Sequence, residues 1–131
     1  MKTKLEIILR TIELIKDGTL EAPEGFSQCP VDTLVKICNG CGAEDSKFDL
    51  VPDSLLGLYI GYSCMIHDYE YEVGATSDEK KLADRRFRDN MVSLIYKYSN
   101  WFLRYPRLLM ADGYYKVVDA RGYPAFFTGS K

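Results

Sequence analysis

The sequence lacks both long hydrophobic runs and blocks of charge of one sign. No apolar stretch approaches the roughly 18 to 20 residues that a transmembrane helix needs, and Glu6, Arg10 and Glu13 interrupt the apolar residues near the N-terminus. That segment therefore predicts an amphipathic helix rather than a signal peptide. Because the net charge is −2 and no basic block is present, the composition predicts no nucleic-acid partner. The default expectation is a cytoplasmic location. The alternatives are a phage particle and secretion by a non-classical route.

Histidine and cysteine are scarce as well. His67 is the only histidine, and the four cysteines are Cys29, Cys38, Cys41 and Cys64. Their even number permits two disulfides, whereas the missing export signal favours a reducing compartment. Cys38 and Cys41 form a CxxC pattern, and Cys64 and His67 form a CxxH pattern. These four residues are one candidate for a structural zinc site, with Cys29 as a spare ligand.

Helical periodicity extends over most of the chain, and strand signals are weak. The 131 residues, 47% of them hydrophobic, suit one domain with one core. The sequence predicts a single all-α domain over residues 1–131, built on an antiparallel helix hairpin at 54–104. Residues 19–29 are rich in turn formers, and residues 39–53 form a glycine- and acid-rich loop. The predicted helices are residues 3–17, a short helix from Pro30 to Asn39-Gly40, and residues 54–73, 77–104 and 107–120.

Two helical stripes face each other across the predicted hairpin. Cys64, His67 and Tyr71 share one face of its first helix, and Asp84 begins an otherwise apolar stripe on its second. His67 and Asp84 are each about 8.5 residues from the centre of the turn, so both lie roughly 10 Å from it along their helices. Because a carboxylate on an apolar face requires a partner, this spacing predicts a pair between His67 and Asp84.

Capping signals set the expected ends of the hairpin helices. Asp53 or Ser54 is expected to cap the first helix, and the Thr-x-x-Glu pattern at 76–79 predicts a capping box for the second. Pro106 is expected to end the second helix just before it. The aromatic segment near that end is expected to pack in the core; its members are Tyr96, Tyr98, Trp101, Phe102 and Tyr105.

The hairpin carries two short motifs, His-Asp-x-x-Tyr on its first helix and Ala-Asp-x-x-Phe on its second. Their residues are His67, Asp68, Tyr71, Ala83, Asp84 and Phe87. Upstream, Cys41-Gly42 is similar to the start of a Cys-Gly-x-Gly calcium-loop element, with Glu44 in place of its second glycine. Over residues 38–91 the chain resembles the phospholipase A2 domains of secretory enzymes and of parvovirus capsid proteins, and a set of uncharacterised phage and prophage proteins.

This resemblance implies a phospholipase A2-like helical fold and a calcium-dependent hydrolase that cleaves the central ester of glycerophospholipids. His67 would act as the general base on a water molecule. Asp84 would orient His67, and Tyr71 would hydrogen-bond Asp84. The implied calcium ligands are Asp68 and the backbone carbonyls of Gly40, Gly42 and Glu44.

The resemblance further implies a disulfide between Cys41 and Cys64 and, for an active enzyme, a phospholipid membrane surface as partner. Free thiols or zinc ligands remain alternatives for these cysteines. Two other hypotheses stay open: a non-enzymatic, phage-derived structural or interaction protein that keeps the hairpin, and a zinc-stabilised helical domain. The three hypotheses differ at His67, because only the enzyme needs a cleft that reaches the imidazole.

Overall fold

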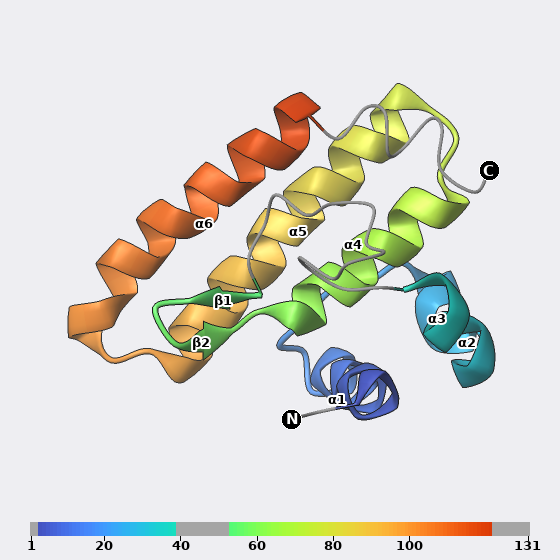
Figure 1. The fold of residues 1–131 in the computed structure, drawn as a ribbon, viewed down its shortest axis with the longest axis horizontal. Helices are drawn as coiled ribbons and strands as arrows, with labels where there is room; N and C mark the ends of the chain where they lie inside the picture. Colours follow the sequence, from blue (N-terminus) through green and yellow to red (C-terminus); the bar gives the residue numbers. More distant parts are fainter. Residues whose placement is uncertain (1–2, 39–52, 122–131) are drawn as a thin grey trace.

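Residues 3–38 and 53–121 are described in the computed structural model (Figure 1). This part of the chain is almost entirely helical, which confirms the predicted all-α class. The predicted loop at 39–53 lies outside the described residues except for its last position. The elements are α1 (Lys4–Lys16), α2 (Glu24–Gln28), α3 (Val31–Ile37), β1 (Ser54–Leu55), β2 (Leu58–Tyr59), α4 (Gly61–Val73), α5 (Ser77–Tyr98) and α6 (Trp101–Arg121).

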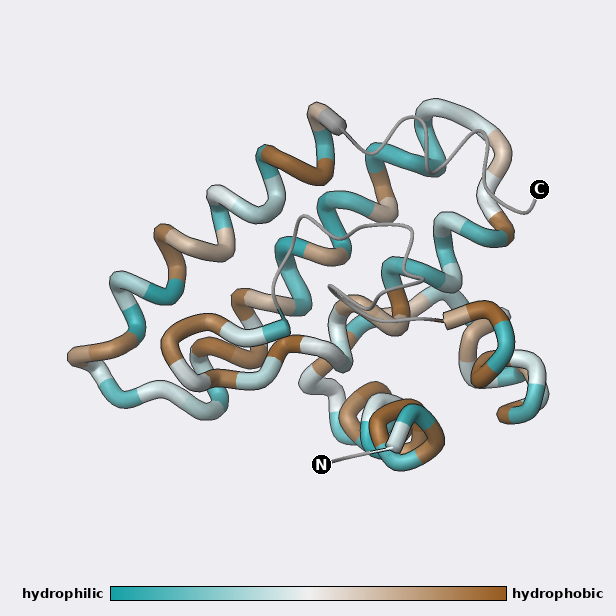
Figure 2. The backbone as a smooth tube through the Cα atoms, in the orientation of Figure 1, coloured by the Kyte–Doolittle hydropathy of each residue, from teal (hydrophilic) through white to brown (hydrophobic). Residues whose placement is uncertain are grey.

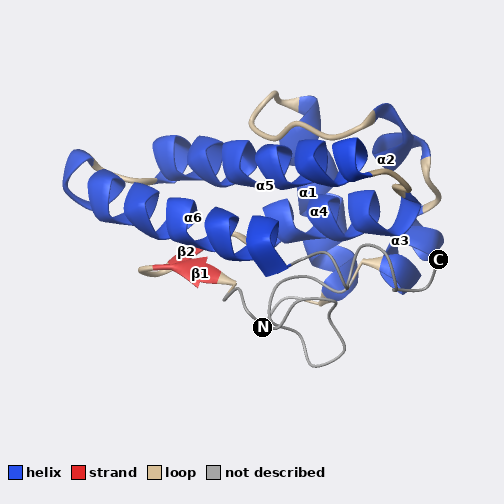
Figure 3. Ribbon diagram, turned by 90° about the horizontal axis from the view of Figure 1, so that it is seen from above, coloured by secondary structure: helices blue, strands red, loops and turns tan. Residues whose placement is uncertain are grey.

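The α4–α5 hairpin occupies the middle of the fold. Figures 1 and 3 show α4 and α5 running antiparallel, with α6 returning along α5. The three N-terminal helices lie on the other side, where α1 and α3 contact α4. Apolar and polar residues alternate along the long helices (Figure 2), as expected for helices that bury one face. The largest fully buried apolar side chains come from both sides of the hairpin: Ile8, Leu14, Phe26, Leu34, Leu55, Ile60, Ile66, Phe87 and Met91.

The capping box predicted for the second hairpin helix is present. The Thr76 hydroxyl accepts a hydrogen bond from the Glu79 backbone N–H at 3.1 Å, and the Glu79 carboxylate accepts one from the Thr76 backbone N–H at 3.1 Å. These contacts satisfy backbone donors that the first turn of a helix leaves without helical partners. The capping box therefore fixes where α5 begins. It thereby also fixes the helix face on which Asp84 lies.

The first hairpin helix begins later than the predicted range 54–73. Its first residue is Gly61, and its N-cap residue is Ile60, whose side chain makes no capping hydrogen bond. Neither Asp53 nor Ser54 caps it, so that expectation is wrong. The preceding residues pair with each other instead of extending the helix.

Residues 54–59 form a small antiparallel β-hairpin. Its two turn residues, Leu56 and Gly57, have φ values of 46° and 84°, which suit the tight primed turns that join two adjacent strands. Arg107 on α6 stabilises the turn by donating to the backbone carbonyls of Leu55 at 3.0 Å and Leu56 at 2.7 Å. A contact this distant in sequence is not visible in the local pattern.

The second hairpin helix also differs from its predicted range of 77–104. It ends at Tyr98, and α6 begins after a two-residue break, so the expected boundary at Pro106 is wrong. The Asn100 side chain caps α6, because its carbonyl oxygen accepts a backbone N–H three residues later at 2.9 Å. Pro106 lies inside α6. The next residue, Arg107, hydrogen-bonds the β-hairpin.

This earlier start of α6 exposes aromatic residues that were expected in the core. Trp101 is 82% exposed, Phe102 69% and Tyr105 68%. The buried face of α6 instead carries Arg107, Ala111 and Val118. The remaining two members of the aromatic segment, Tyr96 and Tyr98, are about half exposed.

Candidate active site

The predicted pair between the only histidine and an aspartate is present across the hairpin. His67 Nε2 on α4 lies 2.8 Å from Asp84 Oδ1 on α5. The side chains are 3% and 0% exposed, respectively. Since an ionised carboxylate only accepts hydrogen bonds, Nε2 is the donor. The imidazole is therefore held with a defined tautomer inside the helix pair.

Two more donors converge on the same carboxylate. The Tyr71 hydroxyl donates to Asp84 Oδ1 at 2.7 Å, as the resemblance implied. Lys80 Nζ donates to Asp84 Oδ2 at 2.6 Å and also to the backbone carbonyl of Asp119 at 3.1 Å. Lys80 is fully buried, and its contact with Asp119 connects the cluster to the last part of α6.

Lys80 was missed as a member of the site. It lies four residues before Asp84 on α5, a spacing that places both side chains on one helix face. The i, i+4 relation was therefore visible in the sequence, but such pairs are far more often exposed. Here α6 contacts the ammonium group, which donates to the Asp119 carbonyl and is fully buried.

Aromatic rings complete the walls around the imidazole. The ring centroid of His67 lies 4.7 Å from that of Phe87 in a stacked arrangement and 4.3 Å from that of Tyr71. Both partners are buried and come from the two predicted motifs. The two rings restrict the rotation of the imidazole. The hydrogen bond from Nε2 then fixes which way the imidazole points.

The surroundings keep Asp84 charged despite its burial. Desolvation alone would raise its pKa, but the hydrogen bond and charge of His67, together with hydrogen bonds from Lys80 and Tyr71, lower the pKa below its usual value. A buried carboxylate with three donors is the arrangement that holds a negative charge at low cost. The cluster is thus a buried anion enclosed by donors.

Asp68 is the one predicted calcium ligand within the described residues. It follows His67 on α4 and is only 2% exposed. The other predicted ligands, Gly40, Gly42 and Glu44, lie outside the described residues. Among residues 3–38 and 53–121, no group of three or more histidine, cysteine or acidic side chains is arranged to hold a metal ion.

The cysteines divide into two kinds. Cys64, three residues before His67, takes part in a disulfide, whereas Cys29 and Cys38 do not. The partner implied for Cys64 by the resemblance, Cys41, lies outside the described residues. A disulfide at Cys64 fixes the first turn of α4 directly before the imidazole.

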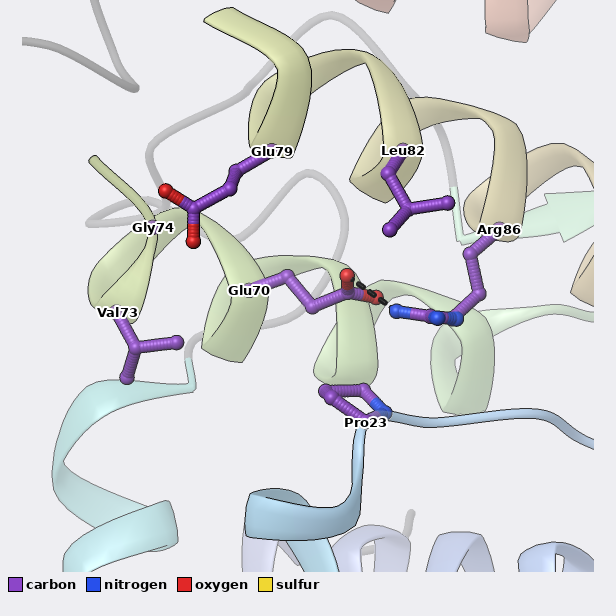
Figure 4. Close-up of a pocket in the computed structure, with 7 residues that line it drawn as sticks. All are labelled: Pro23, Glu70, Val73, Gly74, Glu79, Leu82 and Arg86. Atoms are coloured by element: carbon purple, nitrogen blue, oxygen red, sulfur yellow. Dashed lines mark hydrogen bonds and ion pairs between the residues drawn. The ribbon is translucent and has the colours of Figure 1, made fainter. Parts of the chain in front are cut away.

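A second charged pair connects the same two helices away from this cluster. Arg86 Nη1 donates to Glu70 Oε2 at 2.6 Å, whereas Glu70 Oε1 is buried and has no hydrogen-bond partner within the described part of the chain. Burial raises the pKa of Glu70 to about 7, although Arg86 opposes the shift. Figure 4 shows this pair beside Pro23 and Leu82, at a cavity of about 180 Å³.

Access to His67 differs from access to this second pair. The second pair lines a cavity of about 180 Å³, whereas His67 is only 3% exposed. Asp84, Tyr71 and Phe87 enclose the imidazole on the sides formed by α4 and α5.

Comparisons with protein-family models, with curated proteins and with solved structures find no match for this chain. Within the described residues, no helix combines the length and the apolar character needed to cross a membrane.

Proposed function

We propose that this protein is a calcium-dependent phospholipase A2-like hydrolase that cleaves the central ester of glycerophospholipids. The observation that carries the proposal is the carboxylate of Asp84, which bonds His67 and Tyr71 across the α4–α5 hairpin. These contacts agree with the roles that the two motifs imply for a phospholipase A2-like hairpin.

His67 is the general base in this proposal. Its Nε2 donates to Asp84, so Nδ1 is the ring atom that takes the proton of the attacking water. The carboxylate then stabilises the imidazolium that forms and keeps the ring oriented. Tyr71 and Lys80 position Asp84, since neither needs to touch the substrate to do so.

Asp68 is the side-chain ligand for calcium in this proposal. Its buried carboxylate directly follows the base, and a hard cation prefers such an oxygen. The backbone carbonyls of Gly40, Gly42 and Glu44 complete the proposed ligand set. Bound calcium supplies polarisation of the ester carbonyl and stabilisation of the oxyanion.

The state of Cys64 counts against the zinc alternative. A zinc ligand must be a thiolate, whereas Cys64 is disulfide-bonded. The proposal of a structural zinc site, with ligands Cys38, Cys41, Cys64 and His67, is therefore the weaker one.

The burial of His67 favours a second candidate function. A non-enzymatic helical module, of phage origin as the resemblance suggests, tolerates an imidazole that is only 3% exposed. In that case the cluster serves stability alone. The two candidates make opposite predictions for lipid hydrolysis.

Fatty-acid release from mixed phospholipid vesicles tests the proposal. We expect release by the wild type in calcium, none in excess chelator, and none from His67→Gln or Asp84→Asn in calcium. Asp89→Asn is the matched control, because it changes an exposed carboxylate on the same helix and is expected to keep full release.

Folding is followed in parallel by circular dichroism. If a folded wild-type protein releases no fatty acid in any condition, the hydrolase proposal fails and the helical module is favoured. Release that persists in folded His67→Gln would instead remove the imidazole from the role of base.

A further inference from the structure

The cavity beside the pair of Glu70 and Arg86 has no role in the proposed hydrolysis. It encloses about 180 Å³ between α4 and α5, with Pro23, the residue before α2, at one side (Figure 4). An apolar cavity of roughly 150 Å³ already accommodates a molecule as large as benzene. The space therefore suits a small organic group.

The wall of the cavity combines an open apolar side with a buried polar one. Val73 and Leu82 line it and are 56% and 53% exposed, so they lie at its mouth. Glu70 lines the same cavity and is only 9% exposed. A molecule that enters past the two aliphatic side chains thus meets a carboxylate on the buried side.

One oxygen of this carboxylate has no donor. Arg86 donates to Oε2, whereas Oε1 is buried and has no hydrogen-bond partner among the described residues. Figure 4 shows one oxygen of Glu70 at Arg86 and the other pointing away from it. The last torsion of a glutamate side chain is broad, so a modest rotation offers Oε1 to the cavity while the guanidinium, which has five N–H donors, stays bonded. Since an unsatisfied buried acceptor is costly, a donor from a ligand is favoured here.

The other buried carboxylate of the hairpin shows which donor completes such a group. On Asp84, the second oxygen accepts from the Lys80 ammonium at 2.6 Å. An ammonium supplies both a charge and up to three N–H donors. Glu70 Oε1 is the corresponding oxygen of its own carboxylate, and the cavity provides the space that a side chain fills beside Asp84.

The charges around the cavity favour a cation over an anion. Glu79 also lines the cavity, and its Oε1 accepts from the backbone N–H groups of Ala75 and Thr76. The guanidinium of Arg86 is already bonded to Glu70. Two carboxylates and one paired guanidinium attract a small cation and repel an anion.

We propose that this cavity binds a primary alkylammonium group, whose nitrogen donates to Glu70 Oε1. The carbon chain of the ligand then contacts the apolar wall formed by Pro23, Val73 and Leu82. The group has two possible sources, a free alkylamine and the side chain of a lysine on another protein. The inference stands apart from the proposed hydrolase, because neither Glu70 nor Arg86 takes part in that reaction.

Isothermal titration calorimetry of the full-length protein at pH 8 tests the site. The probe is n-butylammonium, a cation at this pH because such groups titrate near the lysine value of about 10.4. We expect one molecule to bind per chain, and n-butanol, which has the same carbon chain without the charge, to bind at least about tenfold more weakly. Affinity should fall by about fourfold for each CH₂ removed from the probe, down to methylammonium.

Two variants with one charge removed locate the nitrogen of the probe. Glu70→Gln keeps the shape of the side chain and is expected to weaken butylammonium binding by about tenfold or more. Asp78→Asn is the matched control, because Asp78 is an exposed carboxylate near the start of α5 that lies outside the cavity wall. It should change the affinity by less than about twofold. Circular dichroism checks that both variants are folded.

Three results would overturn the site. These are no binding of butylammonium by the folded wild type, equal affinity for butanol, and equal losses in the two variants, which would reduce the effect to general surface charge. A lysine blocked at both backbone ends identifies the source. Binding as strong as that of butylammonium supports a lysine side chain of a partner protein, and much weaker binding supports a free alkylamine. Fatty-acid release tests the hydrolase separately, so either proposal can fail without the other.

Discussion

Two carboxylates on the α4–α5 hairpin, both buried and both paired with cations, have opposite protonation behaviour. Asp84 accepts from His67, Tyr71 and Lys80, and its pKa is lowered. Among the described residues, Glu70 accepts a side-chain hydrogen bond from Arg86 alone, and its pKa is raised to about 7. Burial penalises both charges, so the number of donors on each carboxylate decides the outcome.

The difference shows that a single salt bridge does not keep a buried carboxylate charged in this fold. One guanidinium on one oxygen of Glu70 does not compensate for the desolvation of its carboxylate, whose second oxygen has no hydrogen-bond partner in residues 3–38 and 53–121. Asp84 has donors on both oxygens, so its charge persists in the core. A carboxylate that is charged at neutral pH is also what the proposed histidine base needs beside it.

Removing the charge of Asp84 is expected to have the largest effect on stability. Asp84→Asn leaves the Lys80 ammonium buried without its closest counter-charge, which should cost about 3–5 kcal/mol in the free energy of unfolding at pH 7. Because the pKa of Asp84 is lowered, this contribution is complete at neutral pH and is lost as the pH falls below its usual 3.8. Denaturant unfolding of the variant measures the cost.

The double variant Lys80→Met/Asp84→Asn sharpens this result. It removes both charges, so we expect it to be more stable than Asp84→Asn alone. Equal or greater destabilisation of the double variant would show that Lys80 stabilises the fold by some contact other than its pair with Asp84.

Glu70 is expected to give a pH dependence of opposite sign. Between its ordinary 4.5 and about 7, the folded protein keeps a proton on Glu70 that the unfolded chain releases, so stability falls as the pH rises. Glu70→Gln lacks this loss. Between pH 4.5 and 7, its free energy of unfolding should therefore rise relative to that of the wild type by on the order of 3 kcal/mol. Parallel unfolding curves from pH 4.5 to 8 measure the difference, and curves with a constant offset would contradict the raised pKa.

A smaller effect on stability is expected from removing one of the hydrogen-bond donors to Asp84. Tyr71→Phe deletes the hydroxyl bonded to Oδ1 while His67 and Lys80 stay in place, and it should cost about 1–2 kcal/mol. Tyr96→Phe, which removes a half-exposed hydroxyl on the same hairpin, is the control and should change stability by less than about 0.5 kcal/mol. If both variants behave alike, the number of donors does not explain the difference between the two carboxylates.

Some of these features were predictable because they depend on local spacing. The His67–Asp84 pair followed from the distance of each residue to the turn, and the Thr-x-x-Glu capping box fixed that turn. The β-hairpin at 54–59 was missed because its turn is stabilised by Arg107, far along the chain. The exposure of Trp101 is not visible in the local pattern either, because Pro106 lies inside α6 and the Asn100 side chain caps that helix at its start. Catalysis and calcium binding remain predictions, to be tested by lipid hydrolysis.

The bond from Lys80 to the Asp119 carbonyl has a consequence for biosynthesis. A ribosome makes the α4–α5 hairpin before it makes the end of α6, so the nascent hairpin holds a lysine for which one of its acceptors, the Asp119 carbonyl, has not yet been synthesised. The ammonium must remain hydrated until α6 closes over it, because burial without its partners is costly. During translation, the enclosed cluster around Asp84 is therefore completed only after residue 119 has emerged.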